Sequence, residues 1–207
     1  MRLERRHIDA LDKAEKLLFH SNFCPYLELK ELFSKDTLEA RDQFRYLFSD
    51  YYGMNSAGLT DEFKARYFAI LFGNEVFCNG EPNFVSILNE LSEIPNKKGL
   101  RSLQCSFVSK LIGMHREASP VYDSNVSQFF GEEVPGSWRS QDRRISWFVD
   151  FLKRVAEDYK VWAQDAQIYA ILERFKTRDT RLAACDTVRL MDFLVWNVGS
   201  RKLLGNK

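Results

Sequence analysis

Hydrophobic residues recur at intervals of three to four positions along most of this chain of 207 residues. Near the N-terminus this spacing is shown by Ile8, Leu11, Ala14, Leu17 and Leu18. It is the spacing of an α-helix that buries one face. No segment of useful length alternates apolar and polar residues as a half-buried strand would. The pattern therefore predicts an all-α fold.

Short polar residues, glycines and prolines divide this pattern into separate helices. Thr37 and Thr60 precede apolar stretches and can cap the free N–H groups of a helix start. Gly73 and Pro95 are typical of helix ends. After the first helix, we expect helices over residues 38–51, 60–72, 82–94, 100–115, 121–131, 145–175 with a break near Ala163, and 185–198. Only residues 120–122 resemble a strand, and they are too few to form a sheet.

A chain of this length with 45% hydrophobic residues can bury one substantial core. We expect a single helical domain over residues 1–207, with two packed subdomains as an alternative. The Pro- and Gly-containing turn at residues 132–141 is the expected seam between them. The formal net charge is +1, so a nucleic-acid site would have to be a local basic patch.

The four cysteines and three histidines form no pattern of metal ligands. We therefore expect no metal and no cofactor, and we expect the cysteines to be buried free thiols. The N-terminal residues are charged, and no apolar run reaches the length of a membrane span. These features predict a cytoplasmic protein with no membrane association.

Lys110 has an unusual position in the expected helix 100–115. At about 100° per residue, it lies beside an apolar stripe that includes Leu103, Phe107 and Met114. Loss of hydration lowers the pKa of an ammonium group, and a neutral amine is what imine formation requires. The alternative is a lysine whose methylenes cover the core while its charge reaches water. The helical pattern alone leaves both interpretations open.

Asp123 stands where a turn becomes the next expected helix. As an N-cap, its carboxylate would accept the N–H groups of Asn125 or Val126. A position at a helix start also favours the ionised carboxylate. Residues 94–116 contain no acid, and their basic residues are Lys97, Lys98, Arg101, Lys110 and Arg116. Such a patch can bind phosphates, although a solvated basic face is the ordinary interpretation.

Two segments, Ser106-Phe-Val-Ser-Lys110 and Pro120-Val-Tyr-Asp-Ser-Asn-Val126, resemble the active-site region of the helix-hairpin-helix DNA glycosylases. They are similar in particular to the bacterial 8-oxoguanine glycosylase-like proteins. The resemblance implies that Lys110 is the nucleophile at the sugar C1′. It implies that Asp123 stabilises the developing cation or assists proton transfer. It also implies a helical glycosylase-like bundle. Taken with the basic patch, it leads us to expect that DNA is contacted by Lys97, Lys98, Arg101, Ser109 and Arg116.

A weaker similarity lies upstream, where Asn55 matches the residue that fills the gap left by an extruded base. The alternative is a turn asparagine with left-handed backbone. The chain departs from the family before the lysine, because Leu103-Gln-Cys-Ser-Phe107 contains none of the hairpin glycines that approach a DNA phosphate. Either this hairpin has another geometry, or the segment is continuous helix and side chains bind the phosphate.

The resemblance leads to the expectation of a monomeric DNA glycosylase with abasic-site lyase activity, acting on an altered base such as an oxidised purine. Its partner would be duplex or single-stranded DNA. The alternative is a non-catalytic protein of the same fold that binds nucleic acid or another protein, for instance in bacterial defence. A third interpretation is a helical adaptor in which Lys110 and Asp123 are purely structural.

Overall fold

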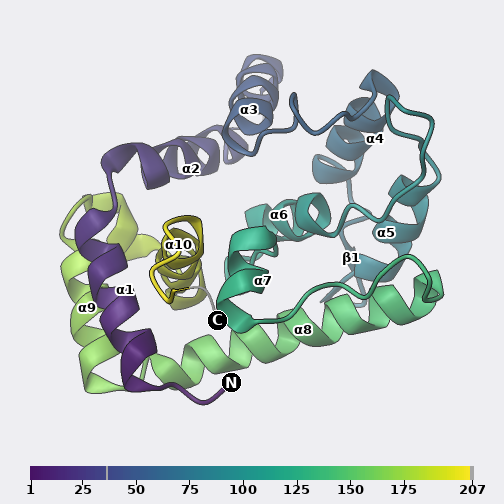
Figure 1. The fold of residues 1–207 in the computed structure, drawn as a ribbon. Coiled ribbons are helices and arrows are strands. Elements are labelled where there is room, and N and C mark those ends of the chain that lie inside the picture. The colour runs from purple at the N-terminus through teal and green to yellow at the C-terminus, as the bar shows by residue number, and fades with distance from the viewer. Residues whose placement is uncertain (36, 206–207) are drawn as a thin grey trace. The chain divides into compact units, whose positions relative to one another are not determined.

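The computed structural model describes residues 1–35 and 37–205 of the chain. Within these residues the regular structure comprises ten α-helices, one 3-10 helix and one two-stranded hairpin (Figure 1). The prediction of an all-α fold is therefore confirmed. No helix in the described residues is both long enough and apolar enough to cross a membrane.

The chain forms two compact units, which we describe separately. The first unit comprises Met1–Phe23 and His115–Lys207, and the second comprises Cys24–Met114. Both boundaries fall inside helices, namely α2 (His20–Phe33) and α6 (Cys105–His115). Residues 132–141, where we expected a seam, instead connect α7 to α8 inside the first unit.

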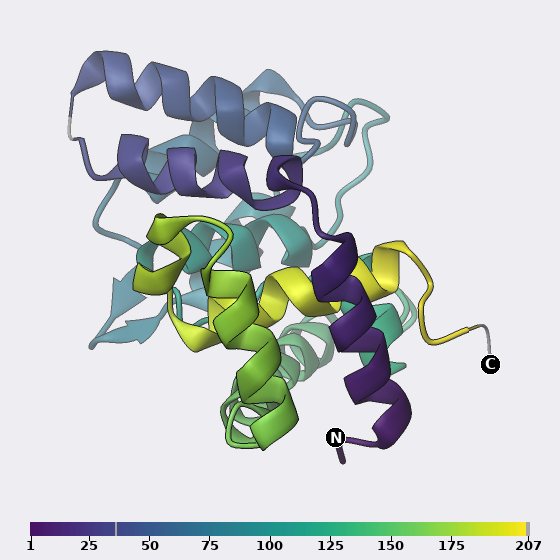
Figure 2. The same ribbon diagram turned by 90° about the vertical axis from the view of Figure 1, so that its left-hand side faces the viewer.

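Helix α10 is the centre of the first unit. It contacts four other helices of that unit, and Figure 2 shows it crossing α1. The elements are α1 (Arg5–Leu17), α7 (Ser124–Phe130), α8 (Gln141–Trp162), α9 (Ala166–Lys176), the 3-10 helix η1 (Thr180–Ala184) and α10 (Thr187–Ser200). Residues 188–195 of α10 are all buried, as expected for a helix that is packed on every side.

A glycine allows α10 to approach the start of α7 closely. A Cβ atom added to Gly199 would lie 2.2 Å from the carbonyl oxygen of Asn125, a distance that atoms in contact do not reach. The nearest atoms all belong to the Asn125 backbone, which cannot turn away as a flexible side chain would. Glycine at position 199 is therefore required for this contact between the two helices.

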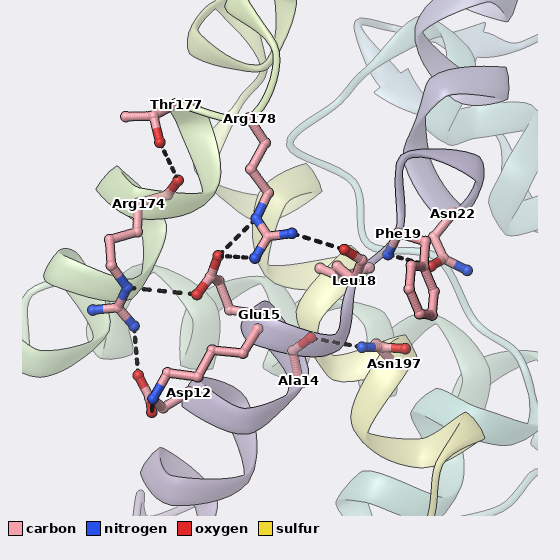
Figure 3. Close-up of polar contacts among 11 residues, drawn as sticks. Asp12, Ala14, Glu15, Leu18, Phe19, Asn22, Arg174, Thr177, Arg178 and Asn197 are labelled. Carbon is pink, nitrogen blue, oxygen red and sulfur yellow. Dashed lines mark hydrogen bonds and ion pairs between the residues drawn. The ribbon is translucent and has the colours of Figure 1, made fainter.

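Helices α1 and α9 are joined by a network of polar contacts (Figure 3). The buried carboxylate of Glu15 accepts hydrogen bonds from Arg178 at 2.8 Å and from Arg174 at 3.5 Å. Arg174 also pairs with Asp12. Because a buried carboxylate is costly without partners, these two arginines explain how Glu15 is accommodated.

The second unit is built around aromatic side chains. It contains most of α2 and α6, together with α3 (Leu38–Tyr51), α4 (Asp61–Leu71), β1 (Phe77–Cys78), β2 (Glu81–Pro82) and α5 (Phe84–Ser92). The rings of Phe44 and Phe48 stack at 5.4 Å. The buried hydroxyl of Tyr67 donates to the carbonyl of Phe107 at 2.8 Å and thereby joins α4 to α6. Burial raises the pKa of Tyr67 well above its usual value.

The predicted helix starts are correct where a threonine caps the helix. Thr37 accepts the N–H of Ala40, and Thr60 accepts the N–H of Phe63, each at 3.2 Å. The break near Ala163 is also confirmed, because α8 ends at Trp162 and α9 begins at Ala166.

Two elements of local structure were not predicted. Helix α2 was not predicted, and Pro25 lies inside it. Its buried residues Tyr26, Leu27 and Leu29 explain the helix, because tertiary packing outweighs the local preference. The second is a hairpin at Asn79-Gly80, where both residues have positive φ, as such turns require. Residues 120–122 form no strand, in agreement with the prediction.

Candidate active site

Lys110 projects from the middle of α6 and is buried, with 8% of its surface exposed. Its Nζ donates a hydrogen bond to Ser106 Oγ, one turn earlier, at 2.9 Å. The same nitrogen lies 5.0 Å from the ring centre of Tyr52 and 5.2 Å from that of Phe107. All of these groups belong to the second unit. The ammonium group is thus held against aromatic rings, and the interpretation in which it extends into water is wrong.

This environment has two opposing effects on the amine. Burial removes water from the charged form, whereas aromatic faces attract a cation. Ser106 can accept a hydrogen bond from an ammonium group or donate one to a neutral amine. The site can therefore hold the side chain in one orientation in either protonation state, which a nucleophilic lysine requires before and after it loses its proton.

Helix α6 begins at Cys105, five residues later than predicted. Residues 101–104 are not helical, so the interpretation of this segment as continuous helix is wrong. The preceding loop is shaped by Asn96, whose Oδ1 accepts the N–H groups of Lys98 and Leu100, and by Gly99, whose φ is +74°. Leu100 is consequently exposed, whereas Phe107 still belongs to the buried face of α6.

The predicted phosphate-binding residues differ in their accessibility. Lys97 and Lys98 are exposed on the loop after α5, where they can meet an anion. Arg101 is exposed but pairs with Glu93 at 2.7 Å, an acid just outside the acid-free segment. Ser109 is fully buried, and its hydroxyl donates to the carbonyl of Ser106 at 2.9 Å. Arg116 belongs to the first unit, whereas the other four belong to the second.

Asn55 is exposed on the turn between α3 and α4. Its Oδ1 accepts a hydrogen bond from Lys64 Nζ at 2.9 Å. Asn55 does not have a positive φ, so the alternative of a left-handed asparagine is wrong. The left-handed positions of this turn are Gly53 and Gly58 instead. Lys64 also lines an open surface hollow of about 350 Å³, together with Arg45, Asp61, Ala65 and Phe68.

Asp123 is the N-cap of α7, as predicted. Its Oδ1 accepts the N–H groups of Asn125 at 2.9 Å and Val126 at 3.0 Å. The side chain is only half-buried, and Oδ1 alone makes both cap bonds. Asp123 belongs to the first unit and Lys110 to the second. The structure therefore defines the surroundings of each residue separately.

A buried polar cluster surrounds the segment that leads to Asp123. Asp192 Oδ2 accepts the N–H of Val121 at 2.9 Å and a hydrogen bond from Arg189 at 2.8 Å. Arg189 also donates to the carbonyl of Ser119 at 3.3 Å. Arg189 and Asp192 are only 3% and 5% exposed. This pair on α10 therefore binds backbone groups two and four residues before Asp123.

The electrostatics of this cluster are dominated by burial. Burial raises the pKa of Asp192 to about 7, against the lowering effect of Arg189 and the Val121 N–H group, and the nearby charge of Asp123 raises it further. Burial likewise raises the pKa of Tyr159 well above its usual value. The buried Tyr159 hydroxyl lies beside the Asp192 carboxyl, and the interaction between the two groups raises the pKa of Tyr159 and lowers that of Asp192.

Arg189, Asp192 and Tyr159 were not among the site residues expected from the sequence. A signal was present, because Val188-Arg-Leu-Met-Asp-Phe-Leu places two opposite charges three residues apart in an otherwise apolar helix. Residues at this spacing are neighbours on a helix surface, and charged residues are rarely buried unless they are paired. This combination indicates a buried ion pair.

The described residues contain no group of His, Cys, Asp or Glu side chains that could hold a metal ion. The cysteines are free thiols, but only Cys105 is buried, and Cys78 is exposed. The expectation of buried thiols is therefore correct for Cys105 and wrong for Cys78.

Comparisons of this chain with protein-family models, with curated proteins and with solved structures find no match.

Proposed function

We propose that this protein is a DNA glycosylase with abasic-site lyase activity, in which Lys110 is the nucleophile and Asp123 is the assisting carboxylate. The observation that carries the proposal is the position of Lys110 Nζ, which is buried, bonded to Ser106 Oγ and held against the rings of Tyr52 and Phe107. The similarity of residues 106–110 and 120–126 to the glycosylase motif supports it, as does the N-cap position of Asp123.

In the proposed reaction, the neutral amine of Lys110 attacks C1′ of the damaged nucleotide. The new C1′–N bond forms as the glycosidic bond breaks, and the electron pair of that bond leaves with the base, which takes up a proton. The Asp123 carboxylate stabilises the positive charge that develops on the sugar. Loss of a proton from the lysine nitrogen, with opening of the sugar ring, then gives an imine, from which β-elimination cleaves the strand.

The proposed fold is the helical bundle of the helix-hairpin-helix glycosylases, and the proposed substrate is an altered base that is flipped out of the stack. Lys97 and Lys98 are the proposed phosphate contacts, because both are exposed and lie on the loop that precedes α6. Arg101 can contribute once a phosphate competes with Glu93 for its guanidinium group.

Borohydride trapping tests this proposal directly. Duplexes that carry 8-oxoguanine, uracil or an abasic site are incubated with the protein and borohydride, which reduces a lysine imine to a stable adduct. We expect an adduct that Lys110→Gln abolishes and that Lys153→Gln, a matched change at an exposed lysine on α8, retains. The absence of any adduct with wild-type protein on all three duplexes would contradict the lyase mechanism.

Salt-dependent DNA binding without an adduct would instead indicate the non-catalytic nucleic-acid-binding module. One observation favours this alternative. The rings of Tyr52 and Phe107 stabilise the charged form of Lys110, which is the form that a binding residue uses. Binding that weakens between 50 and 200 mM salt, equally for damaged and undamaged duplexes, would distinguish the module from an enzyme.

A further inference from the structure

The segment that leads into α7 is bound to α10 through its backbone. Arg189 and Asp192 use charged side chains to bind the carbonyl of Ser119 and the N–H of Val121. These peptide groups flank Pro120, which has no N–H and a restricted φ. The peptide groups on both sides of Pro120 are thus hydrogen-bonded to α10. These bonds restrict the backbone conformation of the segment before Asp123.

This arrangement is costly if its only role is stability. Burial of an ion pair gains little over well-packed apolar residues of similar size, because both charges must lose their water. The Arg189–Asp192 pair is almost fully buried, and it bonds the backbone as well as its own partner. What such a pair provides is orientation, because each hydrogen bond fixes the direction of the group that it binds.

A second contact fixes the other side of Asp123. Gly199 lies directly against the backbone of Asn125, two residues after Asp123. Asp123 itself accepts the N–H groups of Asn125 and Val126. Helix α10 therefore contacts the backbone both before and after the N-cap residue, Asp123.

We propose that Arg189 and Asp192 are positioning residues, which set the orientation of the Asp123 carboxylate by holding the backbone of residues 119–121. Neither residue touches substrate, because both are buried beneath the segment that they bind. The catalytic effect of this inference rests on the proposed function, whereas its structural effect does not. A misplacement of about 1 Å can reduce a rate about 100-fold, so the catalytic effect is measurable.

The structural consequence is tested by hydrogen exchange at single amides. We expect Asp192→Ala to accelerate exchange at Asn125 and Val126, whose N–H groups are bound by Asp123 rather than by Asp192. Asp192→Asn keeps an oxygen that can accept the Val121 N–H, and it should retain most of the protection. Unchanged exchange at Asn125 and Val126 in Asp192→Ala would overturn the proposal. Equal losses in the alanine and asparagine variants would also overturn it, because the bond to Val121 would then not be the cause.

The control is Glu15→Gln, which weakens the ion pair of another buried carboxylate in the same unit. If it accelerates exchange at Asn125 and Val126 as much as Asp192→Ala does, general loss of stability explains the result and the proposal fails. If Asp192→Ala does not fold, Arg189→Lys replaces it. Lysine keeps the charge but cannot bind Ser119 and Asp192 with a planar fork, so the same two amides should lose protection.

The catalytic consequence is measured as the rate of borohydride trapping on an abasic-site duplex, in a single turnover. We expect Asp192→Ala to reduce this rate about 100-fold with DNA affinity changed less than twofold, and Asp192→Asn to recover most of the rate. An unchanged rate with altered exchange would overturn the catalytic part. If wild-type protein forms no adduct, the proposed function fails, and the exchange experiment still decides whether Arg189 and Asp192 position Asp123.

Discussion

The carboxylate of Asp192 accepts the backbone N–H of Val121 at 2.9 Å, and 71 positions of sequence separate the two residues. This bond connects α10 to the segment before Asp123. It also places an acid where water cannot reach it, in contact with Arg189 and near Tyr159 and Asp123. Several measurable properties follow from the burial of this acid and from its neighbours.

The stability of the first unit should depend on the protonation of Asp192. Its pKa is raised from 3.8 to about 7 in the folded protein, so between pH 4 and 7 the folded state holds a proton that the unfolded state has released. The free energy of unfolding should therefore fall as pH rises through this range, by at most about 4 kcal/mol, and level off above it. Asp192→Asn should remove this slope.

Urea denaturation between pH 4.5 and 8.5 measures the effect. Asp150→Asn, an exposed acid on α8, is the control. If Asp150→Asn flattens the profile and Asp192→Asn does not, the assignment of the slope to Asp192 is wrong.

Replacement of Asp123 should separate its role as a cap from its role in chemistry. Asparagine caps helices about as well as aspartate, whereas alanine costs about 1 kcal/mol. We therefore expect Asp123→Asn to unfold at nearly the wild-type temperature and Asp123→Ala to unfold earlier. If the carboxylate is catalytic, both variants should lose trapping activity. A fully active Asp123→Asn would show that only the cap matters.

Gly199→Ala should destabilise the protein, although alanine normally favours a helix by about 1 kcal/mol over glycine. The added Cβ would meet the Asn125 backbone at 2.2 Å, so α7 and α10 must separate. A cost of about 1–3 kcal/mol is expected for such overpacking. Ser200→Ala, at the exposed end of the same helix, is the control, and thermal unfolding compares the two. A stabilised Gly199→Ala would contradict the close approach.

Loss of the Glu15 carboxylate should have a larger effect than loss of the neighbouring Asp12 carboxylate, although both contact Arg174 (Figure 3). Glu15 is buried, so Glu15→Gln leaves Arg178 without its charged partner, at a cost of about 1–3 kcal/mol. Asp12 is partly exposed, and Asp12→Asn should cost less than about 1 kcal/mol. Chemical denaturation at pH 7 measures both, and equal effects would show that burial does not govern this network.

Helical periodicity and capping residues were sufficient to predict much of the local structure. The all-α class, the starts at Thr37 and Thr60 and the N-cap role of Asp123 follow from interactions between residues three or four positions apart. The helix through Pro25 could not be predicted in this way, because the burial of its apolar face depends on partners elsewhere in the chain. The hairpin at Asn79-Gly80 was not predicted, although an Asn-Gly pair is itself a local signal for such a turn.

For the candidate site, too, the sequence predicts the features that depend on neighbouring residues and not those that depend on tertiary packing. The sequence by itself determined that Lys110 lies beside an apolar stripe and that Asp123 begins a helix, because both depend on near neighbours in the chain. Only the tertiary structure decided that Tyr52 lies against the Lys110 amine, that Ser109 is buried, and that Asp192 binds Val121. These contacts join residues far apart in sequence, and they form only when packing brings separate helices together.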